Sequence, residues 1–415
     1  MMRVSIGILL IALLSATVSA EEPLRFDNYK VFKVFVNEDG QYQSLKNIEK
    51  TLKLNFWKEI RSLGDDCDIM VPPEQVLDFE KFLKKSSMGF NVTIENVQEL
   101  IDNEKPKTRS TGMEWTNYHT LDEIHNWIES LAKRFPKQVS LFSIGKSFEG
   151  RDIKGLKISY KKGNKATFIE ANIHAREWIT SAVITYIIDE LLVSRHPAVR
   201  DIAENMDWYI IPVLNVDGFV YSHEVDRMWR KSRQSHGNKC VGTDMNRNFG
   251  FLWMSAGASD DSCSETYAGP YAQSEPEINQ LVQYVEALPD DYIKIYISLH
   301  SYGQYVLSPW GHTEELPEGY KAMMHVAKGY ADSLKRRYGT VFTYGSSALT
   351  LYKVSGSGKE WAYAVKGIPI PYTIELRDKG TYGFILPPEQ ILPTAKEVLE
   401  GFIGMIQAAR EINIV

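Results

Sequence analysis

The sequence has few cysteines, no excess of positive charge and no apolar run long enough to cross a membrane. Only three of its 415 residues are Cys, and 47 Lys and Arg against 53 Asp and Glu give a formal net charge of −6. Weak acidity without a basic block argues against nucleic acid as a partner, and a spanning helix needs roughly 18 consecutive apolar residues. The composition, 44% hydrophobic and 24% charged, is that of a globular chain long enough for two folded units. Function must therefore lie in a local site.

The first twenty residues have the three parts of a secretory signal peptide. A positive start, Met-Met-Arg, precedes the apolar stretch 4–14, and the small residues Ser19 and Ala20 follow. A stretch of this length is too short to span about 30 Å of hydrocarbon. The sequence predicts a signal peptide over residues 1–20, and hence a secreted, extracellular protein that does not reside in a membrane.

Secretion favours disulfides, because the compartment is oxidising. Cys240 and Cys263 lie 23 residues apart around a polar, glycine-rich stretch and can close one loop, whereas Cys67 is far upstream. Such a bridge would contribute roughly 3 kcal/mol through loop entropy. Three free buried thiols are the alternative. Asn91, followed by Val-Thr, is a candidate glycosylation site.

Residues 21–109 have the pattern of a small domain that ends in a linker. β-Branched and aromatic runs alternate with helical periodicities; the runs are 29–36, 67–71 and 90–94, and the periodicities cover 45–52 and 76–83. This alternation in a short segment predicts a small α+β open sandwich. No catalytic cluster is apparent in it.

The linker is a candidate cleavage site. Segment 104–112 is polar, contains Pro and Gly, and carries Lys107 and Arg109. Exposed loops of this kind are where proteolysis concentrates, so a trypsin-like protease would cut after Arg109 and release residues 110–415. An ordinary solvated linker is the alternative.

The rest of the chain alternates strands with helices. Strands are expected at 138–144, 153–160, 166–171, 208–214, 292–299 and 368–376, with helices at 176–192, 275–288, 320–336 and 388–406. Several strands are continuous apolar runs, typical of strands buried on both faces of a mostly parallel sheet. We therefore expect an α/β domain with a mixed, mostly parallel central sheet flanked by helices, and sites at its strand ends.

Two histidines and a glutamate follow or end buried strands. His174 and Glu177 lie just after 166–171, and His300 ends the strand 292–299. Two His and one Glu can give zinc three protein ligands and leave a fourth position for water. Taken singly, each is more often a hydrogen-bonded structural residue.

A metal hydrolase also needs a base beside the bound water. Glu375 lies near the end of a buried strand, where desolvation should raise its pKa toward neutrality. The alternative is an ionised, structural Glu375 paired with Arg377.

A basic cluster follows in 226–233 and 243–249. Arginines beside an Asn suit carboxylate recognition and oxyanion stabilisation; the alternative is an ordinary solvated basic surface.

Together these segments resemble the secreted zinc metallocarboxypeptidases of the digestive A/B type, over essentially the whole chain. The motifs that carry the resemblance are His174-Ala-Arg-Glu177, Arg227-Met-Trp-Arg-Lys-Ser-Arg233, Asn246-Arg-Asn248, Ser298-Leu-His-Ser-Tyr302, Tyr352 and Tyr372-Thr-Ile-Glu-Leu-Arg-Asp378. The resemblance implies a zymogen with a signal peptide (1–20), an inhibitory pro-domain with a cleavable linker (21–109) and a catalytic domain (110–415). It also implies the disulfide between Cys240 and Cys263 and leaves Cys67 unassigned.

The resemblance assigns roles to particular residues. It implies one Zn²⁺ held by His174, Glu177 and His300, with Glu375 as the base and Arg230 as the oxyanion donor. The substrate-binding residues that it implies are Arg176, Asn246, Arg247, Ser301, Tyr302 and Tyr352. Of these, Asn246, Arg247 and Tyr352 would hold the terminal carboxylate. The implied partners are peptide and protein C-termini, a trypsin-like activating protease and proteinaceous carboxypeptidase inhibitors, with a monomer in the gut lumen as the expectation.

One pocket position departs from the two usual choices in this family, which are apolar for aliphatic and aromatic ends and acidic for Lys and Arg ends. Counting from Tyr352 puts Lys359 there, as in glutamate-preferring members. A cation predicts preference for C-terminal Glu, with Thr373 and Ser347 adding polar contacts, because an apolar side chain would leave the charge unpaired. Alternatively Lys359 reaches solvent or pairs with Glu360, which leaves an apolar pocket of the carboxypeptidase A kind, lined by Leu307, Leu351 and Val354.

Two other functions remain open at this stage. A noncatalytic binding module would be expected to lack a ligand or the base, whereas all four residues are present. A hormone-processing enzyme would act on few substrates rather than in bulk digestion.

Overall fold

The computed structural model describes residues 22–415 except 50, 53, 61–62, 106–111 and 238, and it contains two β-sheets. The predicted signal peptide and the cleavage position Arg109 lie outside the described residues. In the described part, no helix has the length and apolar character that crossing a membrane requires.

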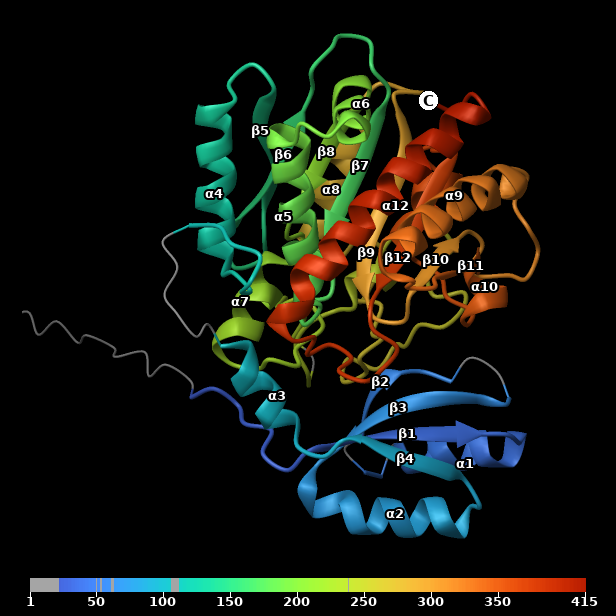
Figure 1. Ribbon diagram of the computed structural model, residues 1–415. Coiled ribbons are helices and arrows are strands. Elements are labelled where there is room, and N and C mark those ends of the chain that lie inside the picture. Colours follow the sequence, from blue (N-terminus) through green and yellow to red (C-terminus); the bar gives the residue numbers. More distant parts are fainter. Residues whose placement is uncertain (1–21, 50, 53, 61–62, 106–111, 238) are drawn as a thin grey trace, which may run out of the picture.

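The first sheet belongs to the smaller, N-terminal domain and is antiparallel throughout, in the order β2-β3-β1-β4. Its strands are β1 (Lys30–Val36), β2 (Asn55–Lys58), β3 (Asp65–Val71) and β4 (Gly89–Ile94), and its helices are α1 (Asp39–Glu49), α2 (Val76–Lys85) and α3 (Val97–Glu104), with a 3-10 turn at Pro73–Gln75. Helices α1 and α2 lie on the side away from the larger sheet, and the edge strand β2 lies toward it (Figure 1). Phe32 and Phe79 meet edge to face in the core between sheet and helices. This is an open sandwich of one sheet and one helical layer.

The second sheet has eight strands in the order β11-β10-β12-β9-β7-β8-β6-β5. The strands are β5 (Val139–Lys146), β6 (Asp152–Ile158), β7 (Ala166–Ala171), β8 (Asp207–Ile211), β9 (Ile293–Ser301), β10 (Tyr305–Ser308), β11 (Thr343–Ser346) and β12 (Ile370–Leu376). The central four, β8, β7, β9 and β12, are parallel, whereas β6 and β10 join them antiparallel. The mixed α/β architecture expected from the sequence is confirmed.

Helices cover this sheet and bury its central strands. They are α4 (Leu121–Arg134), α5 (Trp178–Val193), α6 (Pro197–Asn205), α7 (Val216–Glu224), α8 (Pro276–Glu286), α9 (Tyr320–Tyr338), α10 (Ser347–Thr350), α11 (Gly358–Ala364) and α12 (Ile391–Glu411), with 3-10 turns at Met245–Arg247 and Pro388–Gln390. Helices α5, α9 and α12 lie in front of the sheet in Figure 1. Every residue of β7 is buried, as expected for a strand with covered faces.

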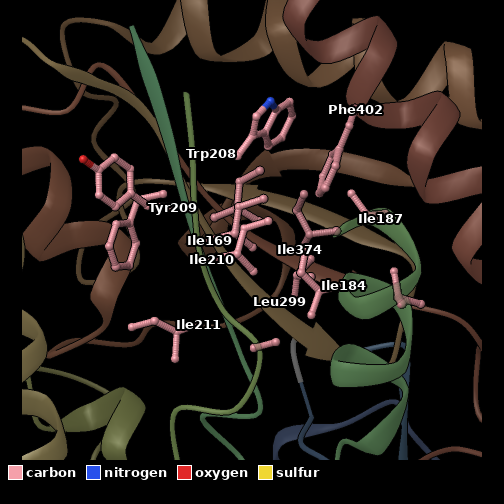
Figure 2. Packing of buried hydrophobic residues seen from close by; sticks show 14 of the residues in the cluster. Ile169, Ile184, Ile187, Trp208, Tyr209, Ile210, Ile211, Leu299, Ile374 and Phe402 are labelled. Atoms are coloured by element: carbon pink, nitrogen blue, oxygen red, sulfur yellow. The ribbon is translucent and has the colours of Figure 1, made fainter. Parts of the chain in front are cut away.

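The core between sheet and helices is closely packed, as Figure 2 shows. Ile169, Ile210, Leu299 and Ile374 come from the four central strands and are fully buried. The ring of Trp208 packs against that of Phe402 from α12, with centroids 6.2 Å apart. Since burying each such side chain contributes roughly 1.5–3 kcal/mol, this packing fixes the strand ends that carry the site.

Several elements were not predicted from the sequence: β2, β10, β11, α3, α4, α6, α7, α10 and α11. The three missed strands have four residues each, too few for an alternating pattern to stand out. Helix α4 did carry a signal, since Thr120 and Glu123 form a capping box. The predicted strand 208–214 ends at Ile211, and residues 212–214 lie outside regular strand and helix. The predicted helix 176–192 starts at Trp178, because Arg176 and Glu177 belong to the loop that carries the site.

The smaller domain contacts the larger one at several places, including three pairs of side chains. Glu104, the last residue of α3, binds the guanidinium of Arg227 through two bonds of 2.7 and 2.8 Å, and both side chains are buried. Tyr302 donates its hydroxyl to Asp68 of β3 at 2.7 Å. Trp57 of β2 packs on Phe384, with ring centroids 5.4 Å apart. The smaller domain is thus fixed over the strand ends of the larger sheet.

Candidate active site and metal centre

Three potential metal ligands converge at the carboxyl ends of β7 and β9. Nδ1 of His174 lies 2.9 Å from Oε1 of Glu177, and Nδ1 of His300 lies 3.1 Å from Oε2 of the same carboxylate. One ligand atom from each of the three residues falls within 4.8 Å of the other two, and all three side chains are buried. Two imidazole nitrogens and a carboxylate oxygen form a donor set that suits Zn²⁺.

Each histidine is oriented through its second nitrogen. Nε2 of His174 lies 2.9 Å from Oδ1 of Asp244, and Nε2 of His300 lies 2.8 Å from Oγ of Ser298. A carboxylate beside Nε2 keeps the proton there and leaves the Nδ1 lone pair for a metal. The backbone N–H of Ser301 donates to Glu177 at 3.1 Å, which fixes the third ligand.

Asp244 is the functional residue that the sequence analysis missed. It is fully buried, and its second oxygen accepts from Arg230 at 2.8 Å. Burial opposes its ionisation, but the charge of Arg230 holds the pKa of Asp244 well below its usual range. The only available signal was its position two residues before Asn246 in an Asp-Met-Asn-Arg run, a pattern too short to be specific.

Glu375 lies beside the metal ligands on the neighbouring strand. It is paired with His300 in the parallel register of β12 and β9. Burial, together with the nearby charge of Glu177, raises the pKa of the Glu375 carboxyl well above its usual range, although Arg230 opposes the shift. Arg377 lies just beyond β12 and donates instead to Glu397 of α12, with Nε 2.9 Å from Oε1. Pairing of Glu375 with Arg377, the structural alternative, is therefore wrong.

A small cleft joins these residues with six of the predicted substrate-binding residues, whereas Lys359 and Thr373 are not among the residues that line it. Its volume is about 110 Å³. The lining from the large domain includes His174, Arg176, Glu177, Arg230, Asn246, Arg247, His300, Ser301, Tyr302, Leu351, Tyr352 and Glu375. The smaller domain contributes four consecutive residues, Phe56, Trp57, Lys58 and Glu59. The strand β2 thus covers the opening of the cleft.

The cations of the cleft are held by backbone groups and carboxylates. Arg247 donates from Nε to the carbonyl of Gly257 at 2.9 Å and from Nη1 to that of Asn246 at 3.1 Å. Arg176 is almost fully buried, and its guanidinium stacks 4.1 Å from the ring centroid of Phe384. These contacts fix two guanidinium groups in the cleft that Arg230 also lines, a set of cations suited to anionic groups on a substrate.

Lys359 is buried and has no carboxylate partner. It is 3% exposed, and its Nζ donates to Oγ of Ser357 at 3.3 Å. Within the described chain, no carboxylate oxygen lies within 4.0 Å of that nitrogen; Glu360 instead accepts from the backbone of Gly311 and from His312. Burial lowers the pKa of Lys359 to about 8. The alternative in which Lys359 reaches solvent is therefore wrong, whereas Glu360 stabilises the ammonium charge without an ion pair within 4.0 Å among the described residues.

Two predicted neighbours of Lys359 differ in their hydrogen bonding. Thr373 is buried, and its hydroxyl has no hydrogen-bond partner among the described residues. Ser347 donates to the carbonyl of Ser308 at 3.2 Å. Leu307 and Val354, expected in the apolar alternative, are also buried, at 2% and 6% exposure.

The remaining predicted residues lie away from the cleft. Cys240 and Cys263 form a disulfide, whereas Cys67 is a free, buried thiol on β3. Asn91 is exposed on β4.

A mixed α/β sheet with a His-Glu-His group at its strand ends, beside a buried carboxyl group, defines a metal-dependent hydrolase. Comparison with known proteins makes the class specific. Residues 124–401 match the family described as zinc carboxypeptidase, and residues 32–104 match the carboxypeptidase activation peptide. The chain belongs to the zinc carboxypeptidase family, as a zymogen that carries its activation peptide.

Three similar proteins illustrate the relationship. Zinc carboxypeptidase A 1 of Anopheles gambiae is 40% identical over 410 residues, which cover 97% of this chain and 94% of that protein. A crystal structure of thrombin-activatable fibrinolysis inhibitor is 33% identical, with a TM-score of 0.86, covering 94% of this chain and all of that one. The bovine form of that protein, in complex with tick carboxypeptidase inhibitor, is 37% identical with a TM-score of 0.67, covering 72% of this chain and 99% of that one. The protein is accordingly a zinc-dependent enzyme that acts on peptide C-termini.

Proposed function

We propose that this chain is the zymogen of a secreted carboxypeptidase that releases C-terminal glutamate. The observation that carries the proposal is the buried Lys359, whose ammonium group faces no carboxylate within 4.0 Å in the described chain. A buried cation without a counter-ion is unfavourable. An acidic substrate side chain would supply the missing negative charge.

The proposed metal ligands are His174, Glu177 and His300. Their donor atoms converge within 4.8 Å, and the imidazoles are oriented by Asp244 and Ser298, which fits the demands of a zinc site. Zinc bound there would supply Lewis acidity to a water molecule and to the scissile carbonyl.

Glu375 would act as general base and then as general acid. Its raised pKa suits a group that takes a proton from the attacking water and returns it to the leaving amine nitrogen. Arg230, held on Asp244, would donate to the oxygen that becomes negative in the tetrahedral state.

Recognition of the free terminal carboxylate would restrict the enzyme to single-residue release. Asn246, Arg247 and Tyr352 line the same cleft and are the proposed carboxylate partners. Arg176, Ser301 and Tyr302 would contact the substrate further from its end.

Specificity for Glu would come from Lys359, with Thr373 and Ser347 as further polar partners. The backbone N–H of Gly358, adjacent to Lys359, donates to Oδ1 of Asn246 at 3.1 Å, so the specificity residue is linked to the carboxylate site. The unpartnered hydroxyl of Thr373 is available to a substrate side chain. An apolar substrate side chain would desolvate the cation without compensation.

Activation would follow cleavage of the linker. We propose a signal peptide at residues 1–20, a pro-domain at 21–109, a cut after Arg109 by a trypsin-like protease, and a monomeric catalytic domain at 110–415 that acts outside the cell, in the gut lumen. Coverage of the cleft by Trp57 and its neighbours in the pro-segment supports inhibition before the cut. Proteinaceous carboxypeptidase inhibitors would compete for the same cleft.

The test uses trypsin-treated protein and matched peptides ending in Glu, Leu and Arg, each with and without a zinc chelator. We expect chelator-sensitive release of Glu well above the other two. Lys359→Leu should transfer preference to the Leu peptide. Lys353→Met is the matched control, since the exposed Lys353 pairs with Glu314 at 2.9 Å, and it should leave the preference unchanged.

Preferential release of Leu by the wild-type enzyme would replace the glutamate assignment by specificity of the carboxypeptidase A kind. Equal preference in the wild type and in Lys359→Leu would remove Lys359 from the pocket.

A further inference from the structure

Lys359 lies among groups that both favour and oppose its charge. Glu360 on α11 and Glu375 on β12 stabilise the ammonium form, while Arg247, in the turn Met245–Arg247, destabilises it. Among the described residues, the side-chain acceptor within hydrogen-bond distance of its Nζ is the neutral hydroxyl of Ser357. A hydroxyl can accept a hydrogen bond from an ammonium group or exchange one with a neutral amine. The local geometry therefore accommodates Lys359 with or without its extra proton.

We propose that the pocket accepts two classes of C-terminal residue, acidic residues while Lys359 is protonated and neutral amide residues such as glutamine when it is not, so that mild alkalinity reverses the selectivity. This inference rests on the proposed placement of Lys359 in the specificity pocket. The hydroxyls of Ser357 and Thr373 supply donors and acceptors for an amide in the neutral state. The change is a single proton on one nitrogen and needs no other reactant.

The pKa of about 8 for Lys359, which burial causes, supports a change within a range where the enzyme can be assayed. A C-terminal Glu side chain remains ionised throughout that range, since its ordinary pKa is about 4.3. Above the pKa of Lys359, binding Glu requires uptake of a proton by the lysine, so the apparent affinity falls about tenfold for each further pH unit. Glutamine has nearly the same shape and requires no such uptake.

The ratio of kcat/KM for a Glu-ended peptide to that for the matched Gln-ended peptide isolates this effect. The direct effects of titrating Glu375, the metal centre and the terminal carboxylate site act on both peptides and cancel in the ratio; Glu375 can change the ratio only through the charge of Lys359. Loss of active enzyme at high pH cancels as well. What remains is the difference between the two side chains in one pocket.

The experiment measures this ratio for the activated wild-type enzyme from about pH 6 to pH 10. We expect a constant ratio in favour of Glu below the pKa of Lys359, and a fall of about tenfold per pH unit above it. The fall should reside in KM of the Glu peptide rather than in kcat, provided that binding equilibrates before chemistry. In Lys359→Arg, whose cation keeps its proton, the ratio should not depend on pH.

Each outcome distinguishes the two proposals. A ratio that favours Glu equally at every pH overturns this inference and leaves the proposed function intact. This inference is also overturned if Lys359→Arg shows the wild-type pH profile, because a group other than Lys359 would then be titrating. No preference for Glu at any pH contradicts the proposed function itself. If Lys359→Arg does not fold, the pH dependence of KM and kcat of the wild-type enzyme on the Glu peptide still tests this inference.

Discussion

The metal centre and the pocket around Lys359 treat buried charge in opposite ways. Asp244 is fully buried, yet it contacts His174 and Arg230 at 2.9 and 2.8 Å, so its negative charge is compensated within the protein. Lys359 is 3% exposed, and the hydrogen-bond acceptor of its Nζ among the described residues is the neutral hydroxyl of Ser357 at 3.3 Å. A charge that already forms an ion pair within the protein holds one geometry for every substrate, whereas a charge without a direct ion pair can gain one from a substrate of opposite charge. We infer that catalysis and selectivity are separable by mutation.

The largest expected effect is on catalysis alone. Glu375→Gln keeps the shape of the side chain but removes the proton acceptor, and should lower kcat by about 10²–10⁴-fold for Glu-ended and Leu-ended peptides alike. Steady-state kinetics on the two peptides checks this. Glu397→Gln is the matched control, since it removes another buried carboxyl group, the partner of Arg377, and should cost stability while kcat is retained. A change in the preference between the two peptides in Glu375→Gln would show that catalysis and selectivity are not separable by mutation.

A smaller effect is expected at the support of the metal ligands. Asp244→Asn replaces the carboxylate that orients His174, and should weaken zinc binding about 10–100-fold. Competition with a chromogenic chelator measures the affinity. Asp217→Asn is the comparison variant, because Asp217 is equally buried but binds Ser147 and Arg151. Equal zinc affinity in wild type and Asp244→Asn would show that the compensating network does not hold the ligand.

The smallest effect is expected in the specificity pocket. Thr373→Val removes a buried hydroxyl that has no partner in the described residues, and a hydrogen bond of this kind contributes about 1 kcal/mol to binding. Release of Glu should fall roughly fivefold relative to Leu, and the melting temperature should not fall, because no internal hydrogen bond is lost. Parallel assays with the two peptides provide the internal reference. A proportional loss on both would place Thr373 in the general machinery instead.

The sequence identified the candidate chemical groups better than the residues and strands that position them. Continuous apolar runs located β7, β9 and β12, and the polar residues at their ends supplied His174, His300 and Glu375 as candidates, because parallel strands end at one edge. Asp244 was not predicted, since its partners His174 and Arg230 are 70 and 14 residues away, and no local pattern encodes such contacts. The strand β2 was missed for the same reason: four residues gain their structure from Phe56 and Trp57 packing on distant surfaces. Tertiary contacts, rather than local propensity, determine both the position of Asp244 and the formation of β2.

The buried pair of Glu104 and Arg227 has a consequence for the timing of activation. It lies at the end of α3, on the pro-segment side of the linker, and Tyr302 with Asp68 and Phe384 with Trp57 join the same two parts further along. Cutting the linker breaks none of these contacts. It makes the pro-segment and the catalytic domain two separate molecules, and the fraction that stays bound then depends on their concentration. At high protein concentration the cleaved pro-segment would remain bound over the cleft. After dilution it would dissociate and leave the cleft accessible. Dilution, as much as proteolysis, would set the moment at which activity begins.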